Sequence, residues 1–259
     1  MITGSLLILA SGGFLSGMLA GLLGIGGGFV VVSILVSLGY TPVQAIATSS
    51  LVIVISSISG SMQNWRMGYL DYKRVIYLGL PALVTAQIGV YWANRIPPYL
   101  LLVTFGFFLI ASICLVDFRK RLIAREENSK LLKFNPIVSR IGTGGITGIL
   151  TGLLGVGGGA ILVPLQMLLL GEPIKLAIQT SLGVIVATAV SACAGHASEG
   201  NILFIQGLLL GVGGFLGAQI STRFLPKLPD SLVCRLFRGF LATMSIYMFW
   251  QAWKIYQAF

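Results

Sequence analysis

Two glycine-rich elements contain the residues of this sequence most suited to chemistry. They read Gly-Leu-Leu-Gly-Ile-Gly-Gly-Gly at residues 21–28 and Gly-Leu-Leu-Gly-Val-Gly-Gly-Gly at residues 152–159. Each lies within a long apolar run, so a break there would leave the N-terminus of a new half-helix. The first N–H groups of a helix lack intrahelical partners and carry partial positive charge, which favours small anions. We therefore predict an anion site at Gly26, Gly27, Gly28, Gly157, Gly158 and Gly159. The alternative is a pair of kinks that serve helix packing alone.

A polar cluster follows each glycine element at the start of the next apolar run. Hydroxyl and amide groups there could complete an oxyanion site, although such groups also hydrogen-bond between membrane helices. The candidates are Gln44, Thr48, Ser49, Ser50, Gln179, Thr180 and Ser181. His196, the only histidine, is a candidate proton site because its side chain titrates near neutral pH. Its alternative is a structural role at a span end.

Other chemistries find little support in the residue pattern. Neither glycine element is followed by the Lys-Ser/Thr pair of a nucleotide-binding loop. Cys114, Cys193 and Cys234 stand singly, so neither a disulfide framework nor a metal site is indicated. We see no base–nucleophile pair and expect neither an enzyme nor a cofactor. Cys193, close to His196, is the one residue that would suit a sulfur-relay protein.

Composition identifies the solvent of the elements that must position these residues. Of 259 residues, 56% are hydrophobic and 9% charged, and mean hydropathy is +0.95, which is typical of an all-α polytopic membrane protein. The 17 basic residues lie in short gaps between apolar runs, so the net charge of +10 does not indicate nucleic-acid binding. The partners expected are lipid and a small anion, and a homo-oligomer stays open.

Apolar stretches long enough to span a membrane recur along the chain. The first, residues 5–38, would be about 51 Å long as one helix at 1.5 Å per residue, so it must bend, break or re-enter. The predicted runs are 5–38, 41–62, 75–94, 98–117, 141–170, 174–195, 202–222 and 236–253. They give a first transmembrane repeat at 1–117, a basic linker at 118–140 and a second repeat at 141–259.

The two halves are homologous. The stretch from Gly13 to Gly28 lines up with the stretch from Gly144 to Gly159, so Gly17 meets Gly148, and in the same register Ser49-Ser50-Leu51 meets Thr180-Ser181-Leu182. One inserted residue later, Ala86-Gln87-Ile88 meets Ala218-Gln219-Ile220. Such duplication is common in secondary carriers, which bind their substrate between the halves near the membrane midplane.

The charges favour inverted halves. The basic linker is predicted to be cytoplasmic by the positive-inside rule. The gap at 63–74 holds three basic residues and its partner at 196–201 none, whereas the gap at 95–98 holds one and its partner at 223–238 holds four. Equivalent loops thus prefer opposite sides, and both termini would face outward. A parallel arrangement is the alternative and would put four basic residues in an external loop.

The duplicated glycine elements, each followed by a short apolar run and then by Thr48-Ser49-Ser50-Leu51 or Thr180-Ser181-Leu182, resemble the TauE/SafE sulfite exporter family over essentially the whole chain. One departure is Ser33, where the repeat and the family pattern place proline. The resemblance implies a transporter, in the sense of export, of sulfite or related small organosulfur anions across the bacterial cytoplasmic membrane. An anion channel, or a membrane sulfur-relay protein using Cys193, is the alternative.

Overall fold

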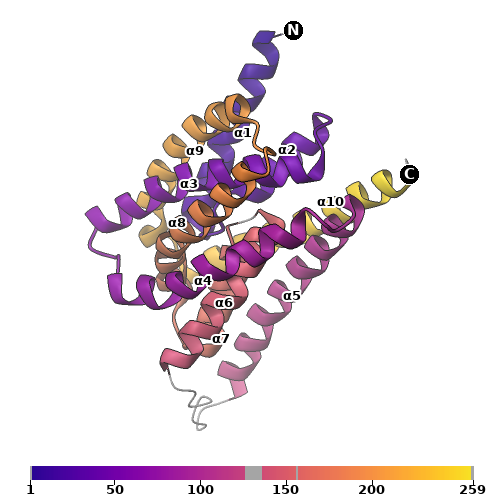
Figure 1. Ribbon diagram of the computed structural model, residues 1–259. Coiled ribbons are helices and arrows are strands. Elements are labelled where there is room, and N and C mark those ends of the chain that lie inside the picture. Colours follow the sequence, from indigo (N-terminus) through magenta and orange to yellow (C-terminus); the bar gives the residue numbers. More distant parts are fainter. Residues whose placement is uncertain (1, 126–135, 156, 258–259) are drawn as a thin grey trace.

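The computed structural model describes residues 2–125, 136–155 and 157–257, and every regular element among them is helical (Figure 1). The α-helices are α1 (Ile2–Leu23), α2 (Gly28–Ser37), α3 (Pro42–Arg66), α4 (Tyr72–Ala93), α5 (Pro98–Arg125), α6 (Pro136–Leu154), α7 (Gly159–Leu169), α8 (Ile174–Ser198), α9 (Phe204–Phe224) and α10 (Asp230–Gln257). One 3-10 turn, η1 (Leu225–Lys227), joins α9 to α10.

Seven of the described helices are long and apolar enough to cross a membrane, namely α3, α4, α5, α6, α8, α9 and α10. Large apolar side chains on these helices point outward, among them Val84 (66% exposed) and Ile246 (73%). Exposed apolar surface on this scale suits a lipid environment. The polytopic all-helical prediction is therefore confirmed.

Both predicted long runs are broken at their glycines. The first divides into α1 and α2 and the second into α6 and α7. Ser33 lies inside α2 without interrupting it, and its Oγ donates to the carbonyl oxygen of Phe29 one turn earlier (2.8 Å). Helix α5 continues to Arg125 and α6 begins at Pro136, so both helices extend into the predicted linker at 118–140. The middle of that linker lies outside the described residues.

The first helix of each half packs on the other half. Helix α1 runs alongside α9 in the same direction, with Gly13 against Leu210 and Gly17 against Gly214. A β-carbon on Gly17 would lie 2.1 Å from the Gly214 carbonyl oxygen, so only glycine permits this approach. Helix α6 lies alongside α4 in the equivalent way, with Gly148 against Ala82.

Each half-helix turns back toward the end from which its predecessor started. The N-terminal half of α1 lies beside that of α9, and after α2 the chain returns to the first turn of α9, where Gln206 Nε2 donates to Tyr40 Oη (3.1 Å). Helices α6 and α7 return likewise to the first turn of α4, where Arg74 meets Glu172. Thus α1–α2 and α6–α7 are hairpins whose tips are the glycine breaks.

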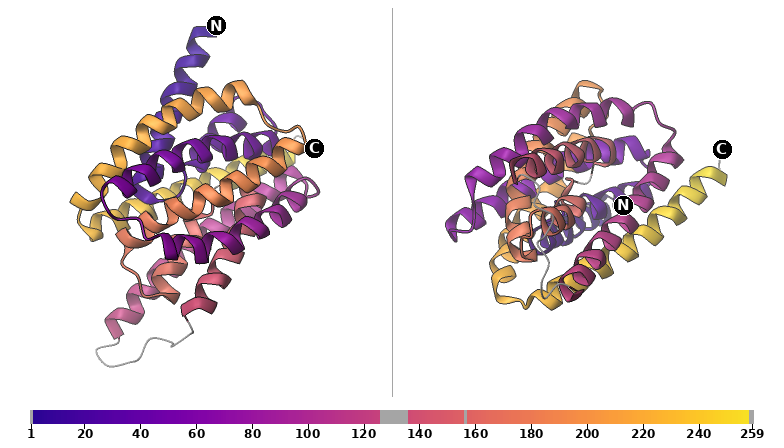
Figure 2. Two further views of the ribbon diagram at one scale, coloured as in Figure 1. Left: turned by 60° about the vertical axis from the view of Figure 1, so that its left-hand side comes forward. Right: turned by 90° about the horizontal axis from the view of Figure 1, so that it is seen from below.

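Helices α3 and α8 form the centre of the bundle and run antiparallel. The end of α3 meets the start of α8, where Asn64 Nδ2 donates to the Gln179 carbonyl oxygen (3.4 Å). Earlier in α3 and later in α8, Ile53 and Ile185 lie together beside Gly26. Helices α5 and α10 lie side by side along one flank (Figure 2). This framework holds the two hairpin tips inside the protein.

Candidate functional site

The two glycine breaks touch each other in the middle of the protein. A β-carbon on Gly26 would lie 3.5 Å from Gly157 Cα, and one on Gly159 would lie 1.9 Å from the Gly24 carbonyl oxygen. Gly26 and Gly157 have φ of 84° and 77°, a conformation that side chains rarely adopt. We call this contact the glycine crossing. All four glycines are buried, so backbone of both halves meets away from lipid.

Hydroxyl groups hold the carbonyl oxygens of the crossing. Ser181 Oγ donates to Gly24 O (2.9 Å) and Ser49 Oγ to Gly155 O (2.6 Å), so each half clamps the break of the other. Both hydroxyls also lie within hydrogen-bond distance of a carbonyl in their own helix. The clamps therefore fix the orientation of the two breaks.

Two further serines act within the first half. Ser16 Oγ donates to Gly27 O (2.8 Å) and Ser56 Oγ to Gly26 O (3.2 Å). Ser16 was not among the residues predicted from the sequence. A signal for it was present, since the hydroxyl residue Thr147 occupies the equivalent position in the second repeat.

The N–H groups of the last three glycines of each break, unlike the clamped carbonyl oxygens, are not hydrogen-bonded to described residues. In the part of the chain that the structure describes, no protein acceptor receives a hydrogen bond from the N–H of Gly26, Gly27 or Gly28, nor from those of Gly157, Gly158 or Gly159. Helices α2 and α7 both begin here, with a left-handed glycine as N-cap and no side-chain cap. Free donors at two helix N-termini favour negative charge.

The crossing is closed in this conformation. The Cγ2 atoms of Ile53 and Ile185, both fully buried, lie 3.0 and 3.4 Å from where a Gly26 β-carbon would be, and both lie 3.1 Å from the equivalent point on Gly157. These isoleucines were not among the predicted site residues, since an apolar residue in a membrane helix carries no local signal. An anion can reach the glycine N–H groups only after a movement.

The predicted polar residues divide between the crossing and other tasks. Ser49 and Ser181 reach the opposite break, as described above. Thr180 is fully buried and its Oγ1 has no partner among the described residues. Thr48 Oγ1 instead accepts from Leu203 N (3.0 Å), and Ser50 Oγ donates to Ala47 O (2.6 Å). The structure therefore brings Ser49 and Ser181 to the breaks but engages Thr48 and Ser50 elsewhere.

The two glutamines do not meet at the crossing. Gln44 caps the start of α3, where its Oε1 accepts from Thr41 N (3.3 Å). Gln179 is 5% exposed, and its backbone oxygen accepts from Asn64.

The structure also corrects the repeat alignment in this region. Ser49 and Ser181 make equivalent bonds to the opposite breaks, so Ser49 corresponds to Ser181 and not to Thr180. This pairing already has the register of Ala86 and Ala218, which we expected only later in the chain. The extra residue lies earlier than predicted, because α7 has 11 residues and α2 has 10.

His196 and Cys193 do not form a reactive pair. His196 is fully buried; its Nε2 lies 3.2 Å from Gly152 O, and its Nδ1 has no partner in the described chain. Cys193 instead contacts Ser50. The described residues contain no group of three or more His, Cys, Asp or Glu side chains arranged for a metal ion.

Known membrane proteins match this sequence over most of its length. The sequence model of the family described as Sulfite exporter TauE/SafE matches residues 9–248. Probable membrane transporter protein YunE of Bacillus subtilis is 26% identical over 255 residues, covering 90% of this chain and 93% of that protein. A probable membrane transporter protein of Methanocaldococcus jannaschii is 27% identical over 252 residues (91% and 92% covered), and one of Xylella fastidiosa 26% over 255 (96% and 97%).

Proposed function

The protein belongs to the sulfite exporter TauE/SafE family and is a multi-pass membrane transporter, and from that premise we propose that its cargo is sulfite or a related small organosulfur anion. The observation that carries this proposal is the polarity of the glycine crossing. Its carbonyl oxygens are engaged by serine hydroxyls, whereas the N–H groups of Gly26–Gly28 and Gly157–Gly159 have no acceptor among the described residues. An oxyanion is the ligand that such donors complement.

In the proposed mechanism, the anion binds the glycine N–H groups, with the Thr180 hydroxyl as a further donor. The two halves then rock against each other, so that the crossing opens first to one side and then to the other. The direction, export, follows the family description alone.

The proposal also includes inverted halves with the basic linker in the cytoplasm. The antiparallel course of the equivalent helices α3 and α8 supports this arrangement, as does the opposite charge bias of equivalent loops. The ends of α3 and α9 and the starts of α4, α8 and α10 would then face the cytoplasm.

The test is sulfite efflux from proteoliposomes containing the purified protein, with sulfate, thiosulfate and sulfoacetate as competitors. We expect saturable flux that competing anions reduce. Flux that rises linearly with sulfite and never saturates would indicate a channel. Flux no greater than in protein-free liposomes would refute the proposed cargo, and Cys193→Ser would then test the sulfur-relay alternative.

Thr180→Val probes the site without disturbing a protein hydrogen bond, because Thr180 Oγ1 has no partner among the described residues. We expect KM for the anion to rise about tenfold, the equivalent of one lost hydrogen bond. A wild-type KM would remove Thr180 from the site. Gly27→Val is a poorer probe, because a β-carbon there would lie 2.3 Å from Ser16 Oγ and the fold would suffer first.

A further inference from the structure

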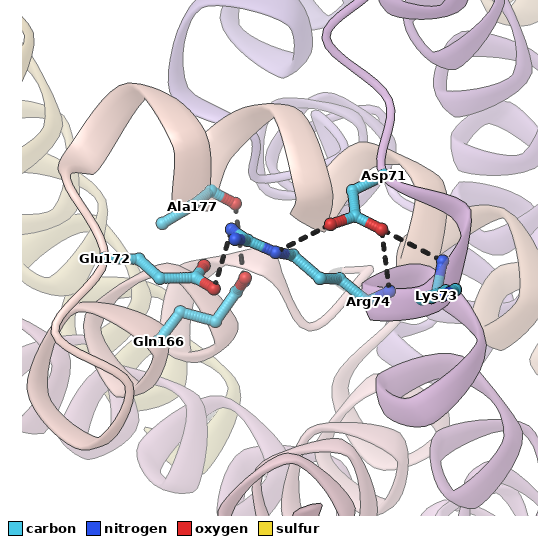
Figure 3. Close-up of polar contacts among 6 residues, drawn as sticks. All are labelled: Asp71, Lys73, Arg74, Gln166, Glu172 and Ala177. Carbon is cyan, nitrogen blue, oxygen red and sulfur yellow. Dashed lines mark hydrogen bonds and ion pairs between the residues drawn. The ribbon is translucent and has the colours of Figure 1, made fainter. Parts of the chain in front are cut away.

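Two contacts join the halves at opposite ends of the bundle, on either side of the closed glycine crossing. In one, Arg74 Nη1 on the first turn of α4 lies 3.0 Å from Glu172 Oε1 on the α7–α8 loop (Figure 3). In the other, Gln206 Nε2 on the first turn of α9 donates to Tyr40 Oη on the α2–α3 loop (3.1 Å). We call them the ionic link and the neutral link.

The two links occupy equivalent places in the repeat. Arg74 corresponds to Gln206, and Tyr40 corresponds to Glu172, in the same register that pairs the clamp serines Ser49 and Ser181. The duplicated scaffold therefore makes one kind of joint twice, each time between the loop after a half-helix and the helix that starts beside it in the other half.

Each link lies beside the C-terminal end of a half-helix that begins at a glycine break, α7 for the ionic link and α2 for the neutral link. We call each half-helix, together with the helix start packed against it, a wedge. Helix α7 begins at Gly159 in the crossing and ends just before the loop that bears Glu172. The start of α4 packs into the same wedge, where Leu78, Leu162 and Val184 form one buried cluster with Val75 beside it. Separating Arg74 from Glu172 would free the outer end of this wedge, and separating Gln206 from Tyr40 would do the same for α2.

The ionic link has a second property. Arg74 Nε also pairs with Asp71 Oδ2 (2.9 Å), and Asp71 is the N-cap of the same helix (Figure 3). When Glu172 withdraws, Asp71 would keep the guanidinium at the mouth of the wedge with its Nη side free. A guanidinium fork matches an oxyanion in charge and shape.

We propose that the two links are the gates of transport, and that Arg74 exchanges Glu172 for the anionic cargo when the ionic gate opens. The inference rests on the proposed transport of a small anion. Both gates are closed in this structure, and the crossing between them is buried, as an occluded conformation requires.

The first experiment measures access to the crossing without using any cargo. Cys114, Cys193 and Cys234 are replaced by Ala, and Thr180→Cys serves as the reporter of the α7 wedge. Labelling by a membrane-impermeant thiol reagent is followed in right-side-out and inside-out vesicles. We expect Glu172→Gln to raise the labelling rate about tenfold from one face only, because the amide oxygen can accept from Arg74 but lacks the charge that strengthens the bond.

The neutral gate is tested in the same background. Tyr40→Phe removes the hydroxyl that Gln206 uses, and Thr48→Cys, near the start of α3, is the reporter. We expect faster labelling from the opposite face only. Labelling that stays unchanged in both link variants, or rises from both faces alike, would overturn the proposal.

Lys175→Ala is the matched control. It breaks the Lys175–Asp230 ion pair (3.2 Å), which joins α8 to α10 within the second half rather than joining the halves. We expect no change in labelling, and a rise equal to that of Glu172→Gln would refute a specific gate.

A comparison of KM values distinguishes cargo binding by Arg74 from its role in the gate. Glu172→Gln and Arg74→Gln should open the gate equally, but only Arg74→Gln should raise KM for sulfite, by about tenfold. Equal KM values would remove Arg74 from cargo binding. Labelling needs no cargo, so the two proposals can fail separately. Altered labelling without sulfite flux would support the gates and refute sulfite as the cargo. Sulfite flux with unaltered labelling would support the cargo and refute the gates.

Discussion

The two ends of the helix bundle share one scaffold but differ in their chemistry. Where α4, α8 and α10 start, ion pairs join Arg74 to Asp71 and Glu172, Lys175 to Asp230 and Arg238 to Asp117. At the end where α3 and α9 start, the links are neutral: Gln206 to Tyr40, Asn201 to Asn94 and Ser37 to Tyr247. All ion pairs within the described residues thus lie at one end.

This contrast shows that residues at equivalent sequence positions join the halves at both ends, but through different chemistry. The ionic end also carries the basic loops that predict the cytoplasm. Separating the two residues of an ion pair costs more free energy than breaking a neutral hydrogen bond, because each buried charge then loses its counterion.

The largest effect should come from the shared scaffold, where the two ends do not differ. Gly17→Val and Gly148→Val would each press a side chain into backbone of the opposite half, so we expect a loss of about 3 kcal/mol or more from each. Thermal unfolding in detergent measures this. Gly142→Val, also on α6 but with open space at its β-carbon, is the control and should unfold near the wild-type temperature. A tolerated Gly148→Val would contradict the close packing of α6 on α4.

The second prediction compares the links directly. Arg74→Ala leaves Glu172, whose side chain is 7% exposed, without its main counterion, and we expect a loss of about 2 kcal/mol. Tyr40→Phe removes one neutral hydrogen bond and should cost about 0.5–1 kcal/mol. Equal losses in the same unfolding assay would show that charge does not distinguish the two ends.

The third prediction makes the ends alike. Tyr40→Glu with Gln206→Arg copies the ionic link onto the neutral end, and we expect turnover in the efflux assay to fall about threefold because both gates then resist opening. Ile205→Lys, which places the equivalent of Lys73 beside the link without joining the halves, is the control and should turn over normally. Faster turnover of the double variant would contradict the gate model.

The smallest effect concerns a second equivalent pair, Asn64 and His196, which share the register of the clamp serines and lie near the ends of α3 and α8. Asn64 Nδ2 donates to the Gln179 carbonyl oxygen in the other half, whereas His196 Nε2 lies 3.2 Å from the Gly152 carbonyl oxygen in its own half. If His196 is a proton site, His196→Asn should leave flux without a pH gradient within about twofold but remove the response of flux to an imposed pH gradient. An unchanged response would leave His196 with a structural role.

Much of the fold could be predicted because lipid imposes simple rules on sequence. Apolar runs of sufficient length predicted the spanning helices, and the length of residues 5–38 required a bend, a break or a re-entry, of which the structure has a break. The candidate site was predicted less completely. Ser49 and Ser181 do reach the breaks, but Gln44 is a helix cap, and Ile53, Ile185 and Ser16 were not recognised because contacts between distant residues leave no local pattern.

The membrane environment, the duplication and the two glycine breaks could all be inferred from the amino-acid sequence, since they follow from hydropathy, self-similarity and the conformational freedom of glycine. The folded arrangement was needed to show that each hairpin returns to the other half, that Ser49 corresponds to Ser181, and that Arg74 faces Glu172. These features depend on which surfaces pack together. Van der Waals fit and hydrogen bonding between helices far apart in the chain select that packing, and neither is encoded in any single stretch of residues.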